Sequence, residues 1–219
     1  MDSRTLVIAA NYCMNQSLFE RAKEFYEQAA NEKNGEAFVG LGNIYLFGYG
    51  VEQDYIKAKE LYEKAAELDY PNAYSKIGYI YSTGKGVEID HTKAFKFFED
   101  GASKGDAEAI YNLGNLYYGG CGVEKDIKKA VQCFELAAQK NYSISYVVLG
   151  KMYLEGEGVD KDREKGLNCI RTAANLGNED AIKIVEIYDL ITMNSQEEAA
   201  GNGRNAFKEN TAQLWKLFQ

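Results

Sequence analysis

The feature that most constrains this chain is an internal repeat with a period of 36 residues. An apolar residue followed by glycine marks each copy, at Leu41-Gly42, Ile77-Gly78, Leu113-Gly114 and Leu149-Gly150. Three more landmarks return in the same register: a tyrosine first seen at Tyr45, a Gly-x-Gly-Val segment at Gly48 and an aspartate at Asp54. A regular period of this length indicates a chain built from stacked supersecondary units.

Each landmark predicts one part of a helix-turn-helix unit. Apolar residues at helical spacing, such as Leu41 and Tyr45, predict the buried face of a first helix. Gly42 is expected to leave room for a neighbouring helix, and Gly48 to end the first helix in a left-handed conformation. Asp54 predicts the start of the second helix, because its carboxylate can accept from free backbone N–H groups. Four aligned residues that tolerate the left-handed conformation are expected near the ends of the second helices: Asp69, Gly105, Asn141 and Gly177. The sequence therefore predicts an all-α solenoid.

Incomplete copies extend the array at both ends, as a solenoid requires of its terminal units. Residues 18–31 match a second helix with Ser17 as the expected N-cap, and a first helix is expected around residues 3–13. The pattern restarts at Ala181 but lacks the glycine loop. We therefore expect one repeat domain over residues 1–193.

The domain organisation follows from the copies. Four full repeats occupy residues 36–179, and residues 194–205 predict a linker because they are polar and contain two glycines. Residues 206–219 predict a last helix. That helix either caps the array or contacts a partner, and Trp215 is the possible tail contact because it is the single tryptophan of the chain.

Composition narrows the class of partner. The chain has 33 acidic and 25 basic residues, a net charge of -8 and a pI near 4.9. Phosphates repel such a chain, so we expect neither a nucleic acid nor a membrane as partner, but a protein, possibly basic. No segment approaches the roughly 18–20 apolar residues of a membrane span, and the first residues do not resemble a secretory signal. We therefore expect a cytoplasmic protein.

Chemistry-bearing motifs are scarce. His91 is the single histidine, and the cysteines Cys13, Cys121, Cys133 and Cys169 form no Cys-x-x-Cys pair. The Gly-x-Gly loops lack the lysine and the preceding strand of a phosphate-binding loop. The sequence therefore predicts no catalytic residue, no metal site and no cofactor.

The repeated text resembles the Sel-one-like repeat family, a branch of the tetratricopeptide-type α/α solenoids. The match begins Glu36-Ala-Phe-Val-Gly-Leu-Gly-Asn-Ile-Tyr-Leu-Phe-Gly-Tyr-Gly-Val51 and continues to Ala66. The resemblance implies a right-handed superhelix and a role as an adaptor or scaffold. Bacterial members of the family act in host interaction, signalling or toxin immunity. One departure is Gly166, which replaces an alanine of the other copies and predicts looser packing of that helix.

The resemblance also implies where a partner binds. In the tetratricopeptide groove the first helices line a concave face, and Asn43 and Asn115 match the position that grips peptide backbone. The basic residues of a carboxylate clamp are missing. An alternative is that several tyrosines only fill the space between repeats. The side chains expected on the concave face are Val39, Asn43, Leu46, Phe47, Ser75, Tyr79, Ser82, Thr83, Tyr111, Asn115, Tyr118, Val147, Lys151 and Leu154.

These observations favour a non-catalytic adaptor or scaffold that binds a protein partner. A bacterial immunity or inhibitor protein that sequesters a toxin or effector is the alternative. A self-assembling structural protein and a hydrolase are less favoured. We expect a monomer, with a dimer through the C-terminal helix as the alternative oligomeric state.

Overall fold

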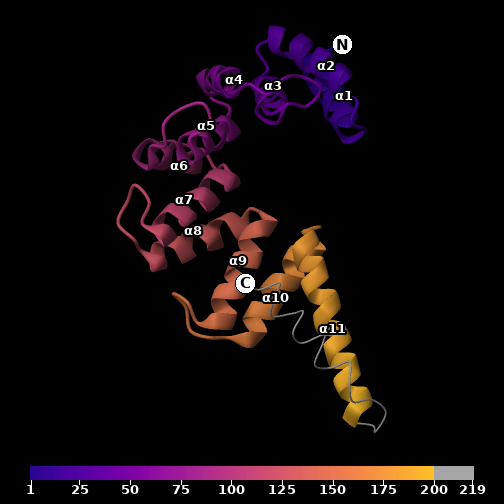
Figure 1. Cartoon of the computed structure of the whole chain (residues 1–219), viewed down its shortest axis with the longest axis vertical. Helices are drawn as coiled ribbons and strands as arrows, with labels where there is room; N and C mark the ends of the chain where they lie inside the picture. Colours follow the sequence, from indigo (N-terminus) through magenta and orange to yellow (C-terminus); the bar gives the residue numbers. More distant parts are fainter. Residues whose placement is uncertain (200–219) are drawn as a thin grey trace. The chain divides into compact units, whose positions relative to one another are not determined.

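The computed structural model describes residues 1–199, and their side chains as far as Leu190. This range is all-α and contains no strand, which confirms the predicted fold class (Figure 1). The helices are α1 (Ser3–Asn15), α2 (Phe19–Asn31), α3 (Gly35–Phe47), α4 (Tyr55–Glu67), α5 (Pro71–Thr83), α6 (His91–Ser103), α7 (Ala107–Gly119), α8 (Ile127–Gln139), α9 (Ser143–Glu155), α10 (Arg163–Asn175) and α11 (Glu179–Ala199).

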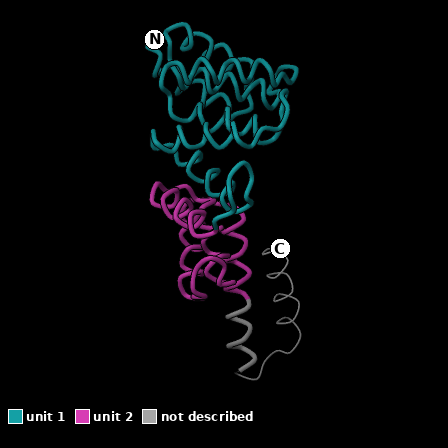
Figure 2. Tube along the Cα trace, turned by 90° about the vertical axis from the view of Figure 1, so that its left-hand side faces the viewer, with its two compact units in different colours: residues 1–126 teal, residues 127–219 magenta. Residues whose placement is uncertain are grey.

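The chain divides into two compact units (Figure 2). Unit 1, Met1–Asp126, contains α1 to α7, and unit 2, which starts at Ile127, contains α8 to α11. Within unit 1, α1 pairs with α2, α3 with α4 and α5 with α6, and α7 packs on both α5 and α6. Within unit 2, α9 pairs with α10, and α8 and α11 pack on opposite members of that pair. Unit 1 is thus a stack of helical hairpins that ends with α7, and unit 2 is one hairpin with a further helix packed on each of its members.

The helix ends follow the predicted chemistry. Gly48 adopts φ +70° at the end of α3, and the carboxylate of Asp54 accepts from the backbone N–H of Lys57 at 2.9 Å. Asp69 and Asn141 hold positive φ after their helices, as expected. Ser17 does not: it has φ +57° and follows the end of α1, and Leu18 precedes α2 without a side-chain cap. The prediction of a serine cap was wrong because a three-residue connection places the serine at the end of the preceding helix.

The glycine within the first helices permits close contact with the second helix. A Cβ at Gly42 would lie 2.3 Å from the Tyr62 ring, so only glycine fits there. Gly166 also has a packing role, because a Cβ there would lie 2.8 Å from Leu154 and 2.9 Å from the carbonyl oxygen of Gly150. The looser packing expected of this copy was therefore wrong, because Gly150 on α9 and Gly166 on α10 face each other and leave no room for a Cβ at either position.

The end of the repeat array also differs from the prediction. α11 continues to Ala199, so residues 194–199 are helical where a linker was expected. The rest of that linker, the predicted last helix over residues 206–219 and Trp215 lie outside the described residues.

Candidate partner-binding face

The odd-numbered helices of unit 1 form one layer. α5 contacts α3 and α7 directly, although one other helix separates it from each of them in the sequence. In each of these helices the second, sixth, ninth and thirteenth residues lie along one line, because an α-helix has 3.6 residues per turn. We call the side formed by these lines the odd-helix face. It consists of Glu36, Gly40, Asn43, Phe47, Asn72, Lys76, Tyr79, Thr83, Glu108, Asn112, Asn115 and Gly119.

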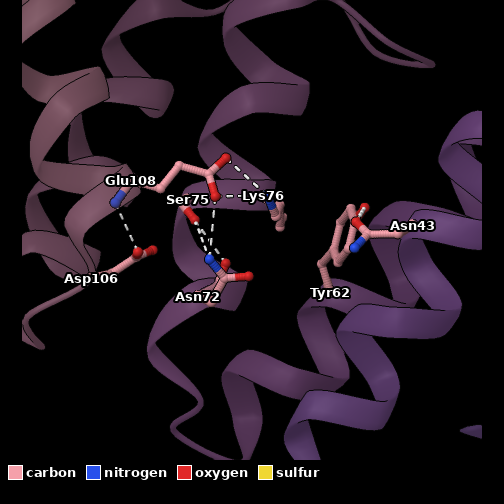
Figure 3. A network of polar contacts seen from close by, with 7 residues as sticks. All are labelled: Asn43, Tyr62, Asn72, Ser75, Lys76, Asp106 and Glu108. Carbon is pink, nitrogen blue, oxygen red and sulfur yellow. Dashed lines mark hydrogen bonds and ion pairs between the residues drawn. The ribbon is translucent and has the colours of Figure 1, made fainter. Parts of the chain in front are cut away.

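A polar network joins two repeats on this face (Figure 3). The ammonium of Lys76 on α5 donates to both carboxylate oxygens of Glu108 on α7, at 2.7 and 2.8 Å. The amide of Asn72 donates to the same carboxylate at 3.3 Å. Charge-assisted hydrogen bonds of this kind hold side chains in a defined geometry. The network therefore fixes the two polar lines against each other.

Tyrosines of the second helices orient asparagines on the first helices. The hydroxyl of Tyr62 is fully buried and donates to Oδ1 of Asn43 at 2.7 Å (Figure 3). Burial raises the pKa of Tyr62, so this hydroxyl stays protonated and remains a donor. The same arrangement occurs one repeat earlier, where Tyr26 donates to Oδ1 of Asn11. There, Nδ2 of Asn11 donates to Glu36 at 3.3 Å.

The odd-helix face is acidic. Glu36 is exposed and makes no ion pair with any described residue. The pKa of Tyr26 is raised to about 12, mainly by burial and to a smaller extent by the negative charge of Glu36. Glu108 adds a second carboxylate, and Lys76 offsets one charge. Unit 1 holds 20 of the 33 acidic residues and 13 of the 25 basic ones, a net charge of -7, and the remaining 13 acidic and 12 basic residues give unit 2 a net charge of -1. The acidity of the chain is therefore concentrated in unit 1.

Two loop lysines lie over aromatic rings of the first helices. The ammonium of Lys85 lies 5.1 Å from the centre of the Tyr79 ring, and that of Lys125 lies 5.7 Å from the centre of the Tyr118 ring. The negative face of an aromatic ring attracts a cation at such distances. These tyrosines therefore already contact cations of the chain itself.

The predicted binding residues divide into three groups. Phe47, Thr83, Asn115 and Tyr118 are exposed, and Asn43, Tyr79, Ser82, Tyr111 and Lys151 are half-buried. Val147 and Leu154 pack against the hydrophobic core of unit 2. Three predictions were wrong, because the side chains are buried between repeats: Val39, Leu46 and Ser75.

The reason for the error is the register of the face. Val39 and Leu46 belong to a core cluster that also contains Ile77 and Ile80 of α5, so the next repeat covers them. The residues that the prediction missed are Glu36, Asn72, Lys76, Glu108 and Asn112. They lie three or seven residues before Asn43, Tyr79 or Asn115, so the helical period counted from these ninth residues would have identified them.

Catalytic or metal chemistry has little support in the described residues. No group of three or more histidine, cysteine, aspartate or glutamate side chains there could hold a metal ion, and no described helix is long and apolar enough to span a membrane. Burial raises the pKa of the Cys133 thiol to about 11, which disfavours the reactive thiolate. An open cleft of about 490 Å³ beside α3 contains Lys23, Tyr45 and Asp54, but the aspartate is used as a helix cap.

The helical hairpins, the repeated glycines and the 36-residue period define an α/α repeat protein. A model of the Sel1 repeat matches residues 17–34, 36–70, 71–106, 107–142 and 143–178. The chain therefore belongs to the Sel1 repeat family, whose fold is a protein-interaction fold.

Solved structures agree with this family. The chain is similar to a Sel1 repeat protein from Oxalobacter formigenes, with 29% identity, a TM-score of 0.71 and coverage of 99% of this chain and 85% of that one. It is also similar to immunity protein Pa5087 from Pseudomonas aeruginosa, with 28% identity, a TM-score of 0.60 and coverage of 74% and 60%. A third similar structure is c5321, a protective antigen of uropathogenic Escherichia coli, with 28% identity, a TM-score of 0.60 and coverage of 90% and 41%. Among curated protein sequences, none matches the chain.

Proposed function

We propose that this chain is a non-catalytic binding protein that holds a protein partner against the odd-helix face of unit 1. The observation that carries the proposal is a set of exposed and half-buried polar side chains on the first helices of three successive repeats, with Glu36 on α3 and Glu108 on α7. Nothing in the arrangement suits bond breaking, whereas ordered amides, carboxylates and a tyrosine ring suit recognition.

The charge of the face favours a partner segment that carries lysine or arginine. Glu36 is exposed and not ion-paired within the described residues, so it is available to a basic side chain. Tyr79 already contacts the ammonium of Lys85, and a cation of the partner can take the same place over the ring. Complementary charge of this kind accelerates association more than it deepens affinity.

The asparagines favour recognition of the partner's main chain. Because Tyr62 holds Oδ1 of Asn43, the Nδ2 group of that amide points away from the hydroxyl and can donate. In the preceding repeat the equivalent group of Asn11 donates to Glu36. A main-chain carbonyl is a suitable acceptor for Asn43, and it carries no charge that Glu36 would repel.

A pull-down with the purified chain from its native lysate, read by mass spectrometry, supplies the partner, and the association kinetics of this captured partner test the proposal. We expect Glu36→Gln together with Glu108→Gln to slow association several-fold at low ionic strength, with the difference shrinking as salt screens the charges. Glu60→Gln together with Glu67→Gln is the matched control, because both carboxylates are exposed on α4, an even-numbered helix. Equal association rates for the two double variants would remove the odd-helix face from the binding site.

Toxin immunity is a second candidate function within the same class of activity. It is favoured by the similarity to the immunity protein Pa5087, at 28% identity over 74% of this chain. In that case the partner is a toxin, and this chain protects cells that produce it. Co-expression with the captured partner distinguishes the candidates: restored growth supports immunity, and growth unaffected by either protein supports an adaptor.

A further inference from the structure

The outer side of α1 carries an uncharged line of four exposed residues. Thr5, Ile8, Tyr12 and Asn15 lie along one side of the helix, and all four are exposed. Ile8 is 62% exposed and Tyr12 is 65% exposed, which is unusual for two large apolar side chains that lie one turn apart. We call this line the α1 face. No other helix of the described residues covers it.

Two of these four positions are covered in α3, α5 and α7. Tyr12 is the tenth residue of its helix, and the tenth residues of α3, α5 and α7 are Ile44, Ile80 and Leu116. Ile44 and Ile80 are fully buried and Leu116 is 6% exposed. The third residues of the same helices, equivalent to Thr5, are fully buried alanines, whereas the sixth and thirteenth residues belong to the odd-helix face. The positions of Thr5 and Tyr12 are therefore packing positions in α3, α5 and α7.

The order of the four residues identifies the occupant. Along α1 they read polar, apolar, apolar, polar, with spacings of three, four and three residues. Such a pattern is unchanged when the helix direction is reversed, so it matches a second copy of itself in an antiparallel orientation. A two-fold interface requires this self-complementarity. We propose that two copies of this chain associate through the α1 face as an antiparallel helix pair.

The pairing places compatible groups opposite one another. With the two-fold axis midway between Ile8 and Tyr12, Ile8 of each copy faces Tyr12 of the other, and Thr5 faces Asn15. The four residues of the line are uncharged. The nearest carboxylate is that of Asp2, which accepts from the Thr5 hydroxyl at 2.9 Å and lies at the end of the line.

The interface is small, and the dimer is correspondingly weak. One pair of short helices buries less than the roughly 1,200 Å² of a standard interface, so we expect a dissociation constant on the order of 10–100 µM. Added salt should strengthen the dimer, because it screens the repulsion between two acidic copies. Added salt should weaken the binding of a basic partner instead, because it screens the attraction between opposite charges, so salt distinguishes the two interactions.

Sedimentation of the full chain over concentrations from about 5 to about 500 µM tests the proposal. We expect the wild type to dimerise and Ile8→Glu to remain monomeric, because the introduced carboxylate would be buried in the pair. Ile56→Glu is the matched control, since Ile56 is an isoleucine on α4 that is 63% exposed, and it should dimerise like the wild type. Far-UV circular dichroism checks that each variant remains helical.

The antiparallel register has its own test. Tyr12→Lys alone should also be monomeric, but a mixture of the Ile8→Glu and Tyr12→Lys variants should form a heterodimer, because the two new charges face each other. A wild type that stays monomeric, or an Ile8→Glu variant that dimerises, would overturn the interface. A mixture that stays monomeric would overturn the register.

Discussion

Two serines of the described chain are fully buried, and they should respond to alanine in opposite directions. Ser145, the third residue of α9, has a buried hydroxyl with no hydrogen-bond partner in the described residues. Ser75, on α5, has a hydroxyl that donates to the carbonyl oxygen of Asn72 at 2.8 Å. The residues that occupy the third position of α3, α5, α7 and α11 are fully buried alanines: Ala37, Ala73, Ala109 and Ala181.

The magnitude follows from the cost of an unpaired hydroxyl. A buried polar group without a partner costs about 1–3 kcal/mol, and alanine removes that cost with little loss of packing, so Ser145→Ala should stabilise the chain by about 1–2 kcal/mol. In a chain of this size that gain raises the melting temperature by about 2–8 °C. Ser75→Ala removes a satisfied hydrogen bond instead and should cost about 0.5–1.5 kcal/mol.

Urea and thermal unfolding of the two variants, followed by circular dichroism, give the comparison. Each variant is the control for the other, because both lose one oxygen atom from a fully buried site. If Ser145→Ala lowers stability as much as Ser75→Ala does, the Ser145 hydroxyl is hydrogen-bonded in solution and the reasoning is refuted.

Two further predictions concern packing and charge. Gly166→Ala should destabilise the chain by about 1 kcal/mol in urea unfolding, although the other copies have alanine at this position. The reason is that overpacking of the new methyl group against Leu154 and Gly150 costs more free energy than the higher helix propensity of alanine contributes. A gain in stability would contradict the close contact between α9 and α10. Burial raises the pKa of the Asp106 carboxyl above 3.8, so the ionised form destabilises the fold and stability falls as pH rises through the window above that value. Asp106→Asn keeps a good helix cap and should be more stable than the parent at pH 7, with the advantage disappearing toward pH 3; an advantage that is equal at both pH values would contradict this sign.

Local chemistry explains which features could be predicted from the sequence. The positions of Gly48, Asp54 and Asn141 were predicted because each depends on the backbone conformation or hydrogen bonding of a single residue. The close contact at Gly42 was also predictable, because the glycine recurs in every full copy. These features need no knowledge of the neighbouring repeat.

The candidate site was only partly predictable, because burial depends on what the neighbouring repeat covers. Val39 and Leu46 are seven residues apart and therefore lie on the same side of α3, which was expected to face a partner, yet Ile77 and Ile80 of α5 pack against that side and bury them. Lys76 lacked any repeated signal, since the equivalent positions hold Gly40 and Asn112, and Glu36 recurs as Glu108 but not in α5. The role of Gly166 depends on its facing another glycine across two helices, which no pattern within one helix reveals.

The odd-helix face of unit 1 is the surface at which we propose that the partner binds. A photo-crosslinking amino acid placed at Asn115, which is exposed on α7, tests this proposal directly against the same amino acid placed at Glu60, which is exposed on α4. We expect the captured partner to crosslink from position 115 and not from position 60. Crosslinking from position 60 with none from position 115 would place the partner on the even-numbered helices and overturn the proposed binding face.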